Sequence, residues 1–368
     1  MYKILISGYY GFNNIGDEAI LKGLIEGISS RLAQVDMVVL SKFPDFTAKK
    51  HNVRAINRIN LFKIFREMRS MDVLVSGGGS LLQDVTSKRS IAYYLGLIWL
   101  AKKIFRKKVM IYSQGIGPVT EKYNRLLVER ILNSVDVINV RDEKSKQELM
   151  EIGVKKEIVV TTDTVFSIPE PSPERGRQIL WKIDRKKDRP YAGVSVRYWK
   201  DCSERVRRET VKFCERLVRE SGLRPVLIPF HFHQDLRLMK EIQRSLPEDI
   251  REEVLMMEQY LYVDDYLSLI GNMEIMAAMR LHGLIFASLM QVCPIGISYD
   301  PKIESFMRIM GETQVMKVEE IDGDRLFDQV VDTLKEMQEN KERFREKVAQ
   351  IRRKAGRHND LLVELLEG

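Results

Sequence analysis

The sequence predicts an α/β protein with two doubly wound, Rossmann-like domains that face one another across a cleft. Short apolar runs alternate with longer amphipathic runs along the chain, which is the pattern of repeated β-α units and parallel sheets. The chain has 368 residues, more than one hydrophobic core usually supports, so two domains are expected. Glycine and polar residues gather directly after the apolar runs, at the strand ends where open α/β sheets bind their ligands.

The expected strands are ten short, mostly apolar runs, six in the first domain and four in the second. A longer amphipathic segment follows most of them, and we interpret it as the helix that crosses back over the sheet. In chain order the runs span residues 2–10, 35–41, 72–78, 109–115, 135–141, 158–164, 191–199, 224–230, 274–280 and 294–300.

The domain boundary is expected in the stretch "SIPEPSPERGRQILWKIDRKKDRP" (167–190), which holds four prolines and a dense cluster of charges. Such a composition is typical of a linker or hinge. We therefore predict an N-terminal domain over residues 1–170, a linker over 171–190 and a C-terminal domain over 191–340. The last residues, 341–368, are expected to form a basic helical tail.

The formal net charge is +8, because 60 basic residues are interleaved with 52 acidic ones. A zinc pattern, an aromatic RNA-binding signature and a DNA-reading helix are all absent from the sequence, so no nucleic-acid partner is expected. A small anionic substrate or an anionic membrane surface explains the excess of positive charge more simply.

The predicted location is the cytoplasm. The start "MYKILISGYY" enters a strand pattern after a single lysine, unlike a signal peptide, and the longest apolar stretch (90–101) is too short to span a bilayer. The three cysteines, Cys202, Cys214 and Cys293, form no C-x-x-C pair and indicate no disulfide framework, which fits a reduced compartment.

The loop "GYYGFNNIGDEA" (8–19) at the end of the first strand is close to two nucleotide-binding fingerprints and matches neither. Gly11 and Gly16 have the spacing that opens a phosphate-binding loop, but Asp17 stands where a lysine is required. An acid there would repel phosphates, so no NAD or ATP cofactor is expected. Two readings stay open: a tight turn capped by Asp17, or a sugar site in which Asn13, Asn14 and Asp17 contact hydroxyl groups.

The stretch "SGGGSLLQD" (76–84) places three consecutive glycines after another strand. Gly78 and Gly79 would let the backbone approach a ligand closely and offer it N–H donors. Gln83 and Asp84 are expected one turn into a helix that follows. The alternative is a sharp strand-to-helix turn without a ligand.

Three arginines, Arg141, Arg197 and Arg280, follow strands at equivalent places in the β-α pattern. Guanidinium groups match carboxylates and phosphates in a bidentate way, so the three together predict recognition of an anion. Arg141 is the weakest of them, because Asp142 and the next residue, Glu143, can simply pair with it.

The segment "MAAMRLHGLIFASLM" (276–290) sets Arg280 and His282 into an apolar run. If the strand ends near Arg280 and a helix begins near His282, both side chains can serve the cleft, and the helix end adds partial positive charge. His282 is then placed as a general acid. The alternative is a core histidine held by hydrogen bonds.

The other histidines carry weaker signals. His51 and His358 lie in charged stretches and are expected to be exposed. His231 and His233, in "PFHFHQD", are read either as a metal pair or as polar residues at a strand end. With no acidic partner at helical spacing, no metal site is expected.

Taken in order, "GYYGFNNIGDEAIL", "SGGGSLLQD" and "RLHGLIFA" resemble the polysaccharide pyruvyl transferase family over roughly residues 1 to 310. The most similar branch is that of bacterial enzymes that place a pyruvate ketal on N-acetylmannosamine of secondary cell-wall polymers. The resemblance implies a GT-B-like fold, phosphoenolpyruvate as the donor substrate and a lipid-linked saccharide as the acceptor. It matches His282 to the general acid, and Arg280 and Arg197 to the donor-binding arginines.

Further expectations accompany this resemblance. Lys302 is an additional binding candidate, and Asp17, Asp84 and Asp163 are candidate proton acceptors, with Asp17 chosen as the catalytic one. The alternative functions are a GT-B nucleotide-sugar glycosyltransferase, with Glu304 on the nucleotide, and a non-catalytic protein that binds lipid-linked saccharides.

A lipid-linked acceptor would bring the protein to the inner face of the cytoplasmic membrane. Basic and large apolar residues mix at "LFKIFREMR" (61–69) and "IWLAKKIFRKK" (98–108). These segments predict attraction to anionic lipid, with shallow insertion of Phe62, Phe65 or Phe105. The alternative is a pair of ordinary amphipathic helices.

Overall fold

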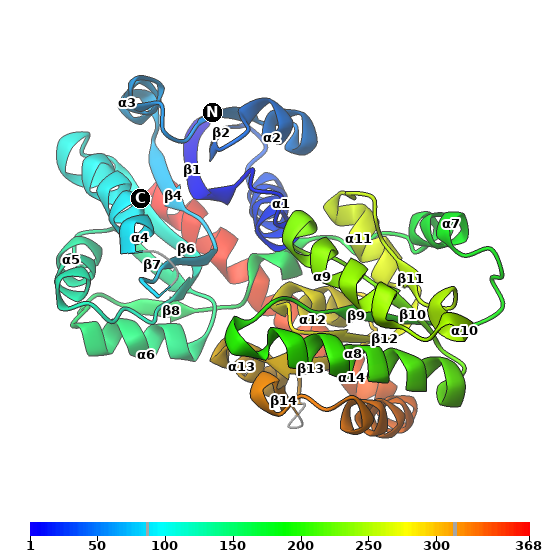
Figure 1. Cartoon of the computed structure of the whole chain (residues 1–368). Coiled ribbons are helices and arrows are strands. Elements are labelled where there is room, and N and C mark those ends of the chain that lie inside the picture. The colour runs from blue at the N-terminus through cyan, green and yellow to red at the C-terminus, as the bar shows by residue number, and fades with distance from the viewer. Residues whose placement is uncertain (86–87, 312–314) are drawn as a thin grey trace. The chain divides into compact units, whose positions relative to one another are not determined.

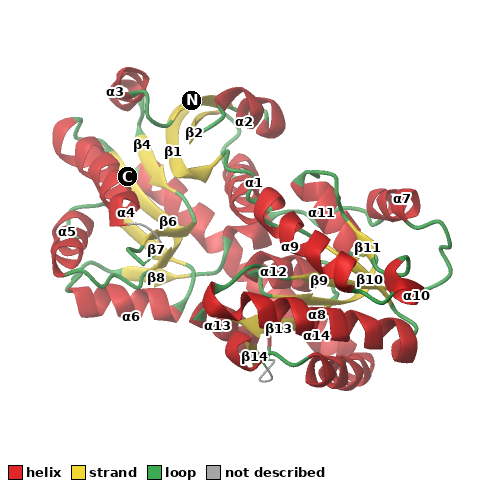
Figure 2. Ribbon diagram, viewed as in Figure 1, coloured by secondary structure: helices red, strands yellow, loops and turns green. Residues whose placement is uncertain are grey.

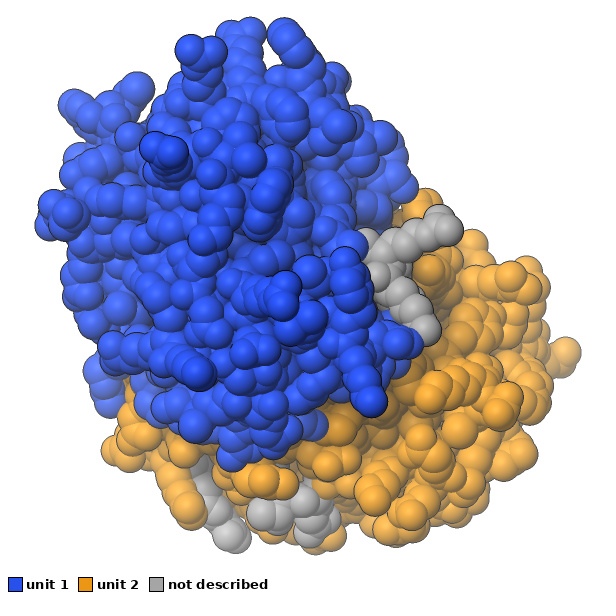
Figure 3. All heavy atoms as spheres, turned by 90° about the vertical axis from the view of Figure 1, so that its left-hand side faces the viewer, with its two compact units in different colours: residues 1–169, 351–368 blue, residues 170–350 orange. Residues whose placement is uncertain are grey.

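The computed structural model of the chain describes residues 1–85, 88–311 and 315–368, without the side chains of 88–89 and 337–341. Its contacts divide the protein into two compact units, coloured separately in Figure 3. Unit 1 comprises Met1–Pro169 and Ile351–Gly368, and unit 2 comprises Glu170–Gln350. Each unit has its own parallel sheet with helices around it (Figures 1 and 2).

The sheet of unit 1 has the strand order β3-β2-β1-β4-β6-β7-β8, and β5 pairs with the end of β6. Its pairings are parallel, and the central strands β1 and β4 are almost continuously apolar because helices cover both faces of such a sheet. The strands are β1 Tyr2–Tyr10, β2 Val35–Ser41, β3 Arg54–Asn57, β4 Val73–Ser76, β5 Gly79–Leu82, β6 Lys108–Ile116, β7 Val137–Val140 and β8 Ile158–Val160.

The helices of unit 1 follow its strands in regular alternation, and short irregular turns complete the connections. They are α1 Ile15–Ser29, α2 Pro44–His51, α3 Leu61–Ser70, α4 Lys88–Trp99 with the π-helical turn η1 Leu100–Ile104, α5 Lys122–Leu132, α6 Glu143–Ile152 and the 3₁₀ turn η2 Thr164–Ser167.

The sheet of unit 2 has the order β11-β10-β9-β12-β13-β14, again with parallel pairings. Its strands are β9 Tyr191–Ser195, β10 Arg224–Leu227, β11 Leu255–Met256, β12 Met273–Ala278, β13 Cys293–Ser298 and β14 Met316–Lys317. Its helices are α7 Glu174–Ile183, α8 Ser203–Arg216, α9 Phe232–Ser245, α10 Glu248–Arg251, α11 Val263–Ile270, α12 Leu281–Leu289 and α13 Pro301–Met310, followed by the start of α14 Gly323–Glu367; the shorter turns are η3 Lys200–Cys202, η4 Leu217–Ser221 and η5 Val318–Glu320.

The ten predicted strands are confirmed, and so is the fold class of two doubly wound parallel sheets. The sequence prediction missed β3, β5, β11 and β14, which have two to four residues each. Strands this short give no readable alternation, and three of the four lie at sheet edges, where little of their surface has to be apolar.

The predicted linker over 171–190 is wrong in its central part. Helix α7 occupies Glu174–Ile183 and packs on α11, where the Gly176 N–H donates to Ser268 Oγ at 2.6 Å. A Cβ on Gly176 would lie 2.0 Å from the Ser268 carbonyl oxygen, so glycine permits this close approach. The prolines flank the helix instead of interrupting it, and for that reason their number misled the prediction.

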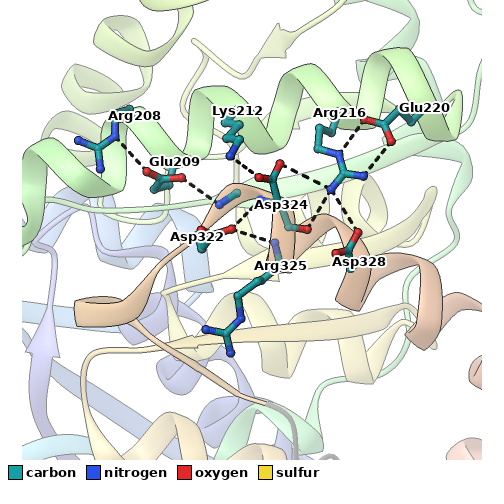
Figure 4. Close-up of polar contacts among 10 residues, drawn as sticks. Arg208, Glu209, Lys212, Arg216, Glu220, Asp322, Asp324, Arg325 and Asp328 are labelled. Carbon is teal, nitrogen blue, oxygen red and sulfur yellow. Dashed lines mark hydrogen bonds and ion pairs between the residues drawn. The ribbon is translucent and has the colours of Figure 1, made fainter.

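The predicted separate tail over 341–368 is also wrong, because these residues continue α14, which begins at Gly323. The start of α14 is fixed to α8 of unit 2 by a charged network (Figure 4). Lys212 pairs with Asp324, and Arg216 Nη1 lies 3.2 Å from Asp328 Oδ1. These pairs are mostly solvent-exposed, so each stabilises the contact only modestly.

The last turns of α14 belong to unit 1 and complete its core. Tyr112 donates its hydroxyl proton to the Asn359 side chain, and Lys108 Nζ donates to the Leu365 carbonyl at 2.8 Å. His358 is fully buried, with Nε2 3.0 Å from Ser167 Oγ. Burial lowers its pKa to about 4. The expectation that His358 is exposed is therefore wrong, because it lies on the inward face of a helix that is charged on its outer face.

The expectation that His51 is exposed is wrong as well. Its side chain is only 4% exposed, and Nε2 lies 3.1 Å from Oε2 of the buried Glu18. Glu18 also accepts the Gly11 N–H at 2.8 Å. The pair holds the first loop against α2, so the charged residues around His51 in the sequence are no guide to its surroundings. None of the helices in the described parts of the chain is both long and apolar enough to cross a membrane.

Candidate active site

Each sheet reverses its strand order at one point, and most of the predicted site residues lie at these two points. In unit 1 the reversal falls between β1 and β4, which are followed by the Asn13–Asp17 loop and the triple glycine. In unit 2 it falls between β9 and β12, which are followed by Arg197 and by Arg280 with His282. Ligands of doubly wound folds bind at the carboxyl ends of strands at such a point.

Arg280 is the N-cap residue of α12, and Asp235 holds it in place. Its Nε donates to Asp235 Oδ2 at 3.0 Å, and its Nη2 donates to Asp235 Oδ1. Asp235 is 1% exposed and comes from the first turn of α9. Because the clamp uses one edge of the guanidinium, Nη1 has no protein partner among the described residues.

Arg197 follows β9 and has a different environment. Its Nη1 donates to the Tyr299 hydroxyl at 3.1 Å, and its guanidinium carbon lies 5.0 Å from the Tyr299 ring centre. Its Nε is buried without a hydrogen-bond partner, and no carboxylate of the described chain pairs with it. Arg197 is thus a half-buried cation whose charge the described residues leave uncompensated.

Lys302, in the first turn of α13, approaches the same tyrosine. Its Nζ lies 5.7 Å from the Tyr299 ring centre and 3.2 Å from Asp300 Oδ2. Burial alone would raise the pKa of Tyr299, but Lys302, Arg197 and Arg280 together lower it below its usual value. The three cations therefore act on one point at the carboxyl edge of the sheet, where an anion would be stabilised.

His282 lies in the first turn of α12, two residues after Arg280, and is half-buried. The predicted break in "AMRLHG" is confirmed: β12 ends at Ala278 and α12 begins at Leu281. A Cβ on Gly283 would lie 3.0 Å from Ala278 Cβ, so glycine allows the helix to start close to the strand.

Sequence reasoning missed three residues of this cluster: His231, Asp235 and Tyr299. His231 is the N-cap residue of α9, and its Nδ1 is buried without a hydrogen-bond partner. Burial lowers its pKa, as do Arg280 and Arg197, while Asp235 raises it. The signal was present in the sequence, because "PFHFHQD" follows the strand next to β9; its histidines were considered only as metal ligands or strand-end polar residues.

In unit 1, the structure brings together Asn13, Asn14, Asp17, Gly78 and Gly79. Asn14 caps α1 by accepting the N–H of its second residue, Gly16, at 3.3 Å, and it donates through Nδ2 to Asp17 Oδ2. A Cβ on Gly79, whose φ is +84°, would lie 3.3 Å from Asp17 Oδ1. The cap of α1 is thus Asn14, and Asp17 stays partly exposed.

Asp84 and Gln83 do not lie in a helix, as the sequence suggested. Strand β5 occupies Gly79–Leu82, and the two residues follow it in a loop. Both Asp84 oxygens are engaged, by the Thr120 N–H and hydroxyl at 2.9 Å, the Glu121 N–H and the Asn124 amide.

These contacts give Asp84 a structural role in place of the predicted one. Burial would raise the pKa of its carboxyl group, but the hydrogen bonds from Asn124, Thr120 and Glu121 lower it to about 2. A carboxylate so firmly ionised is a poor proton acceptor, and its lone pairs already serve the start of α5.

Arg141 is held between two carboxylates instead of facing a free anion. Its Nε lies 3.3 Å from Asp142 Oδ2 and its Nη1 3.3 Å from Asp163 Oδ2. Its Nη2 donates to Ser80 Oγ at 3.3 Å. The Arg141 side chain is 8% exposed, so its role as a pairing residue inside unit 1, the alternative raised for it, fits the structure better than ligand binding.

The same contacts bear on Asp163, the third candidate proton acceptor. Its Oδ1 accepts the Val165 N–H at 3.1 Å as the cap of η2, and its Oδ2 pairs with Arg141. Of the three carboxylates proposed from sequence, Asp17 is the one that combines partial exposure with a position at the strand-order reversal. Within the described ranges, no group of three or more His, Cys, Asp or Glu side chains is placed to hold a metal ion.

Comparison with known proteins identifies a family. The model of the polysaccharide pyruvyl transferase family matches residues 14–301, which include Asp17, the triple glycine, Arg197, Arg280 and His282. No curated protein matches the chain.

Solved structures share the fold at low sequence identity. The ADP-heptose heptosyltransferase II of E. coli is 14% identical, with a TM-score of 0.55 over 92% of this chain and 100% of that one. A putative UDP-N-acetylglucosamine 2-epimerase of Listeria monocytogenes is 12% identical, with a TM-score of 0.64 over 98% and 94%. The UDP-GlcNAc 2-epimerase of Methanocaldococcus jannaschii is 13% identical, with a TM-score of 0.62 over 90% and 91%. At these identities the likeness establishes the GT-B-type fold alone.

Proposed function

Because the chain belongs to the polysaccharide pyruvyl transferase family and is therefore a transferase, we propose that it transfers pyruvate from phosphoenolpyruvate to a sugar of a lipid-linked cell-wall polysaccharide precursor, forming a ketal. The observation that carries the proposal is the cation cluster of unit 2. Arg197 has no carboxylate partner among the described residues, and Arg280 is oriented by Asp235 beside it.

The donor carries a carboxylate and a phosphate on a three-carbon enol, so its site needs at least two cations. Arg197 and Arg280 fit this need, and Lys302 adds a third positive charge near Tyr299. Charge-assisted hydrogen bonds contribute about 1.5–3 kcal/mol each. Two such arginines are enough to hold a small trianion at millimolar or lower concentration.

The acceptor is proposed to bind unit 1, with N-acetylmannosamine as the sugar. Asn13, Asn14 and Asp17 offer amide and carboxylate groups that suit sugar hydroxyls, and Gly78 and Gly79 keep the neighbouring backbone close. Gln83 follows in the adjoining loop. The partial exposure of Asp17 and its place after β1 support this assignment, while Asp84 and Arg141 serve the fold.

The chemistry needs proton transfer and displacement only. His282 protonates the methylene carbon of the enol, which makes the adjacent carbon electrophilic. One sugar hydroxyl bonds to that carbon, the phosphate leaves, and a second hydroxyl closes the ketal. The phosphate of the bound donor favours the charged form of His282, so the acid is available near neutral pH.

A nucleotide-sugar glycosyltransferase is the second candidate, because the structural neighbours are enzymes of nucleotide-linked sugars with the same fold. Glu304, the residue that would contact the nucleotide, accepts the Ser298 hydroxyl at 3.0 Å through one oxygen. The histidine beside the arginines favours the pyruvyl transferase, because acid catalysis at an enol requires it. It also speaks against the third candidate, a protein that only binds lipid-linked saccharides.

A lipid-linked acceptor also requires contact with the inner face of the cytoplasmic membrane. Helix α3 exposes Leu61, Phe62 and Phe65 to solvent, with Phe62 79% exposed. The Phe65 and Phe105 rings lie 5.8 Å apart, which joins this surface to the end of η1, where Ile104 is exposed. Large apolar side chains in such a group are typical of an interaction surface.

Basic residues surround these apolar side chains. Lys63, Arg66 and Arg69 on α3, Lys103 in η1 and Arg106 shortly after it are exposed. The one acid of α3, Glu67, is buried against Lys3 and Arg54. This combination complements an anionic bilayer and supports the peripheral location.

The deciding experiment incubates purified protein with phosphoenolpyruvate and a synthetic lipid-linked disaccharide that ends in N-acetylmannosamine. Mass spectrometry should detect a product heavier by one pyruvate ketal, with release of one phosphate. Incubation with nucleotide sugars in place of phosphoenolpyruvate is the control. Glycosyl transfer in the control, without ketal formation in the main reaction, would replace this proposal by the second candidate.

A further inference from the structure

Unit 2 contains a second histidine whose surroundings set it apart from the residues already assigned. The carboxyl ends of β9, β10, β12 and β13, neighbours in the sheet, carry Arg197, His231, Arg280 and Tyr299 respectively. The donor site proposed above therefore has two imidazoles at its edge, His282 after β12 and His231 after β10.

His231 is held in position by the same carboxylate that orients Arg280. Asp235 Oδ2 accepts the main-chain N–H of His231 at 2.8 Å and that of Phe230 at 3.0 Å, as well as the Arg280 Nε proton. The backbone of His231 is thus fixed relative to the Arg280 guanidinium through one shared partner. Its Nδ1 is buried and makes no hydrogen bond with the described protein.

Burial and two neighbouring cations favour the neutral form of the His231 imidazole. Burial lowers its pKa, and the neighbouring Arg280 and Arg197 lower it further, against the opposing effect of Asp235. These three are the charged groups that act on it, from α12, from the loop after β9 and from its own helix. A neutral imidazole with a free nitrogen is a proton acceptor.

We propose that His231 is the general base of the transfer, taking the proton of the first attacking sugar hydroxyl and passing it to the departing phosphate. This inference rests on the proposed function. It gives the two histidines complementary tasks, because His231 accepts a proton and His282 donates one.

The proton balance follows directly. In the first step His282 gives its proton to the methylene carbon, the hydroxyl oxygen bonds to the adjacent carbon, and His231 takes the hydroxyl proton. In the second step the bond between that carbon and the phosphate oxygen breaks, and the phosphate leaves with the electron pair and the His231 proton. The second hydroxyl bonds to the carbon, and His282 takes its proton. Both imidazoles return to their starting forms.

The test uses His231→Gln, with His233→Gln as a matched control. His233 is two residues further along α9 and exposed, so its loss should leave transfer unchanged. For His231→Gln we expect kcat to fall by about 100-fold or more, because a general base contributes roughly 10²–10⁴. The affinity for phosphoenolpyruvate, measured by calorimetry, should stay within about threefold.

The pH profile separates a base from a structural residue. The acidic limb of kcat/KM, which reports a group that must be deprotonated in the free enzyme, should vanish in His231→Gln. Asp17→Asn should raise the acceptor KM and keep that limb. A melting temperature equal to that of the wild type would show that His231→Gln is correctly folded.

Each outcome decides between the two claims. If the wild type binds phosphoenolpyruvate and makes the ketal while His231→Gln keeps kcat and the acidic limb, the assignment of His231 is overturned and the proposed function stands. Loss of the limb in Asp17→Asn instead transfers the role to Asp17. A wild type that neither binds phosphoenolpyruvate nor makes the ketal overturns both.

Discussion

Arg141 of unit 1 and Arg197 of unit 2 look alike in the sequence, and the structure gives them opposite surroundings. Both follow a strand of a parallel sheet. Arg141 is buried between Asp142 and Asp163, whereas Arg197 lies against the rings of Tyr299 and Trp199 without a carboxylate partner in the described chain. A strand-end arginine whose charge the protein leaves uncompensated, as at Arg197, is therefore a stronger ligand candidate than one buried between two carboxylates.

The largest effect is expected at the reacting end of unit 2. His282→Ala should lower kcat by about 10²–10⁴, the usual contribution of a general acid. Donor affinity should change less than about threefold, because the acid acts in the transition state. Single-turnover kinetics and calorimetry measure the two quantities. A variant within tenfold of wild-type kcat would remove His282 from the mechanism.

The different surroundings of Arg141 and Arg197 can be tested by measuring the free energy of unfolding of variants. Arg141→Ala leaves Asp142 and Asp163 without their shared cation, and breaking a buried pair costs about 3–5 kcal/mol of unfolding free energy. Arg197→Ala leaves no carboxylate behind and should cost about 1 kcal/mol or less. The urea concentrations at the unfolding midpoints of the two variants measure this difference. If both variants lost the same free energy of unfolding, the two arginines would stabilise the fold equally, and the difference in their surroundings would have no energetic consequence.

Donor binding should show the reverse order. Arg197→Ala is expected to weaken phosphoenolpyruvate binding by about 10- to 100-fold, the equivalent of one charge-assisted contact. Arg280→Lys, which keeps a partner for Asp235, should lose about tenfold because the planar fork is gone. Arg141→Ala should bind the donor as the wild type does. Calorimetric titration measures the phosphoenolpyruvate affinity of all three variants. Weaker binding by Arg141→Ala would show that Arg141 contributes to the donor site.

The buried His358 of unit 1 should make the free energy of unfolding depend on pH. The folded-state pKa of His358 is lowered by burial to about 4, while its ordinary value is 6.5. Below pH 6.5 the unfolded chain binds a proton that the folded chain excludes, so the unfolding free energy falls from pH 6.5 towards pH 4. Urea titrations should find a loss on the order of 2 kcal/mol over this window. In His358→Gln this part of the slope should be absent.

The smallest effect is expected when basic residues of α3, which are proposed to contact anionic lipid, are changed to acidic ones. Lys63→Glu and Arg66→Glu should each weaken binding to vesicles with anionic lipid by about fivefold, corresponding to about 1 kcal/mol per basic residue. Lys122→Glu and Lys144→Glu, at exposed positions on α5 and α6, are the matched controls. Co-sedimentation at low and high salt measures the effect. Binding that ignores both lipid charge and α3 would refute the proposed surface. Lys108 is unsuited to this test, because it holds the Leu365 carbonyl.

Sequence alone predicted the sheets well, because the strands of a parallel sheet are buried on both faces and read as apolar runs. It also placed most of the candidate residues at the ends of strands, since glycine and polar residues gather there. What it lacked was the partner of each charge. Nothing near Arg280 in the chain points to Asp235, 45 residues away, and nothing near Asp84 points to Thr120.

The same limit explains the histidines. The sequence around His358 and around His231 is similarly polar. In the structure, however, His358 on α14 is buried in a core, whereas His231 lies near Arg280 and Arg197. Burial and charge come from residues distant in the chain, so the roles of Asp84, Arg141 and His231 became readable only from contacts.

Helix α14 has a consequence for the order in which the chain can fold during synthesis. The sheet of unit 1 is translated before unit 2, but the residues that cover Tyr112 and Ser167, including His358 and Asn359, follow unit 2 in the chain. Unit 2 lies wholly in between, as residues 170–350. The nascent protein can therefore complete the core of unit 2 before that of unit 1, which stays open beside Tyr112 and Ser167 until these residues of α14 have been translated.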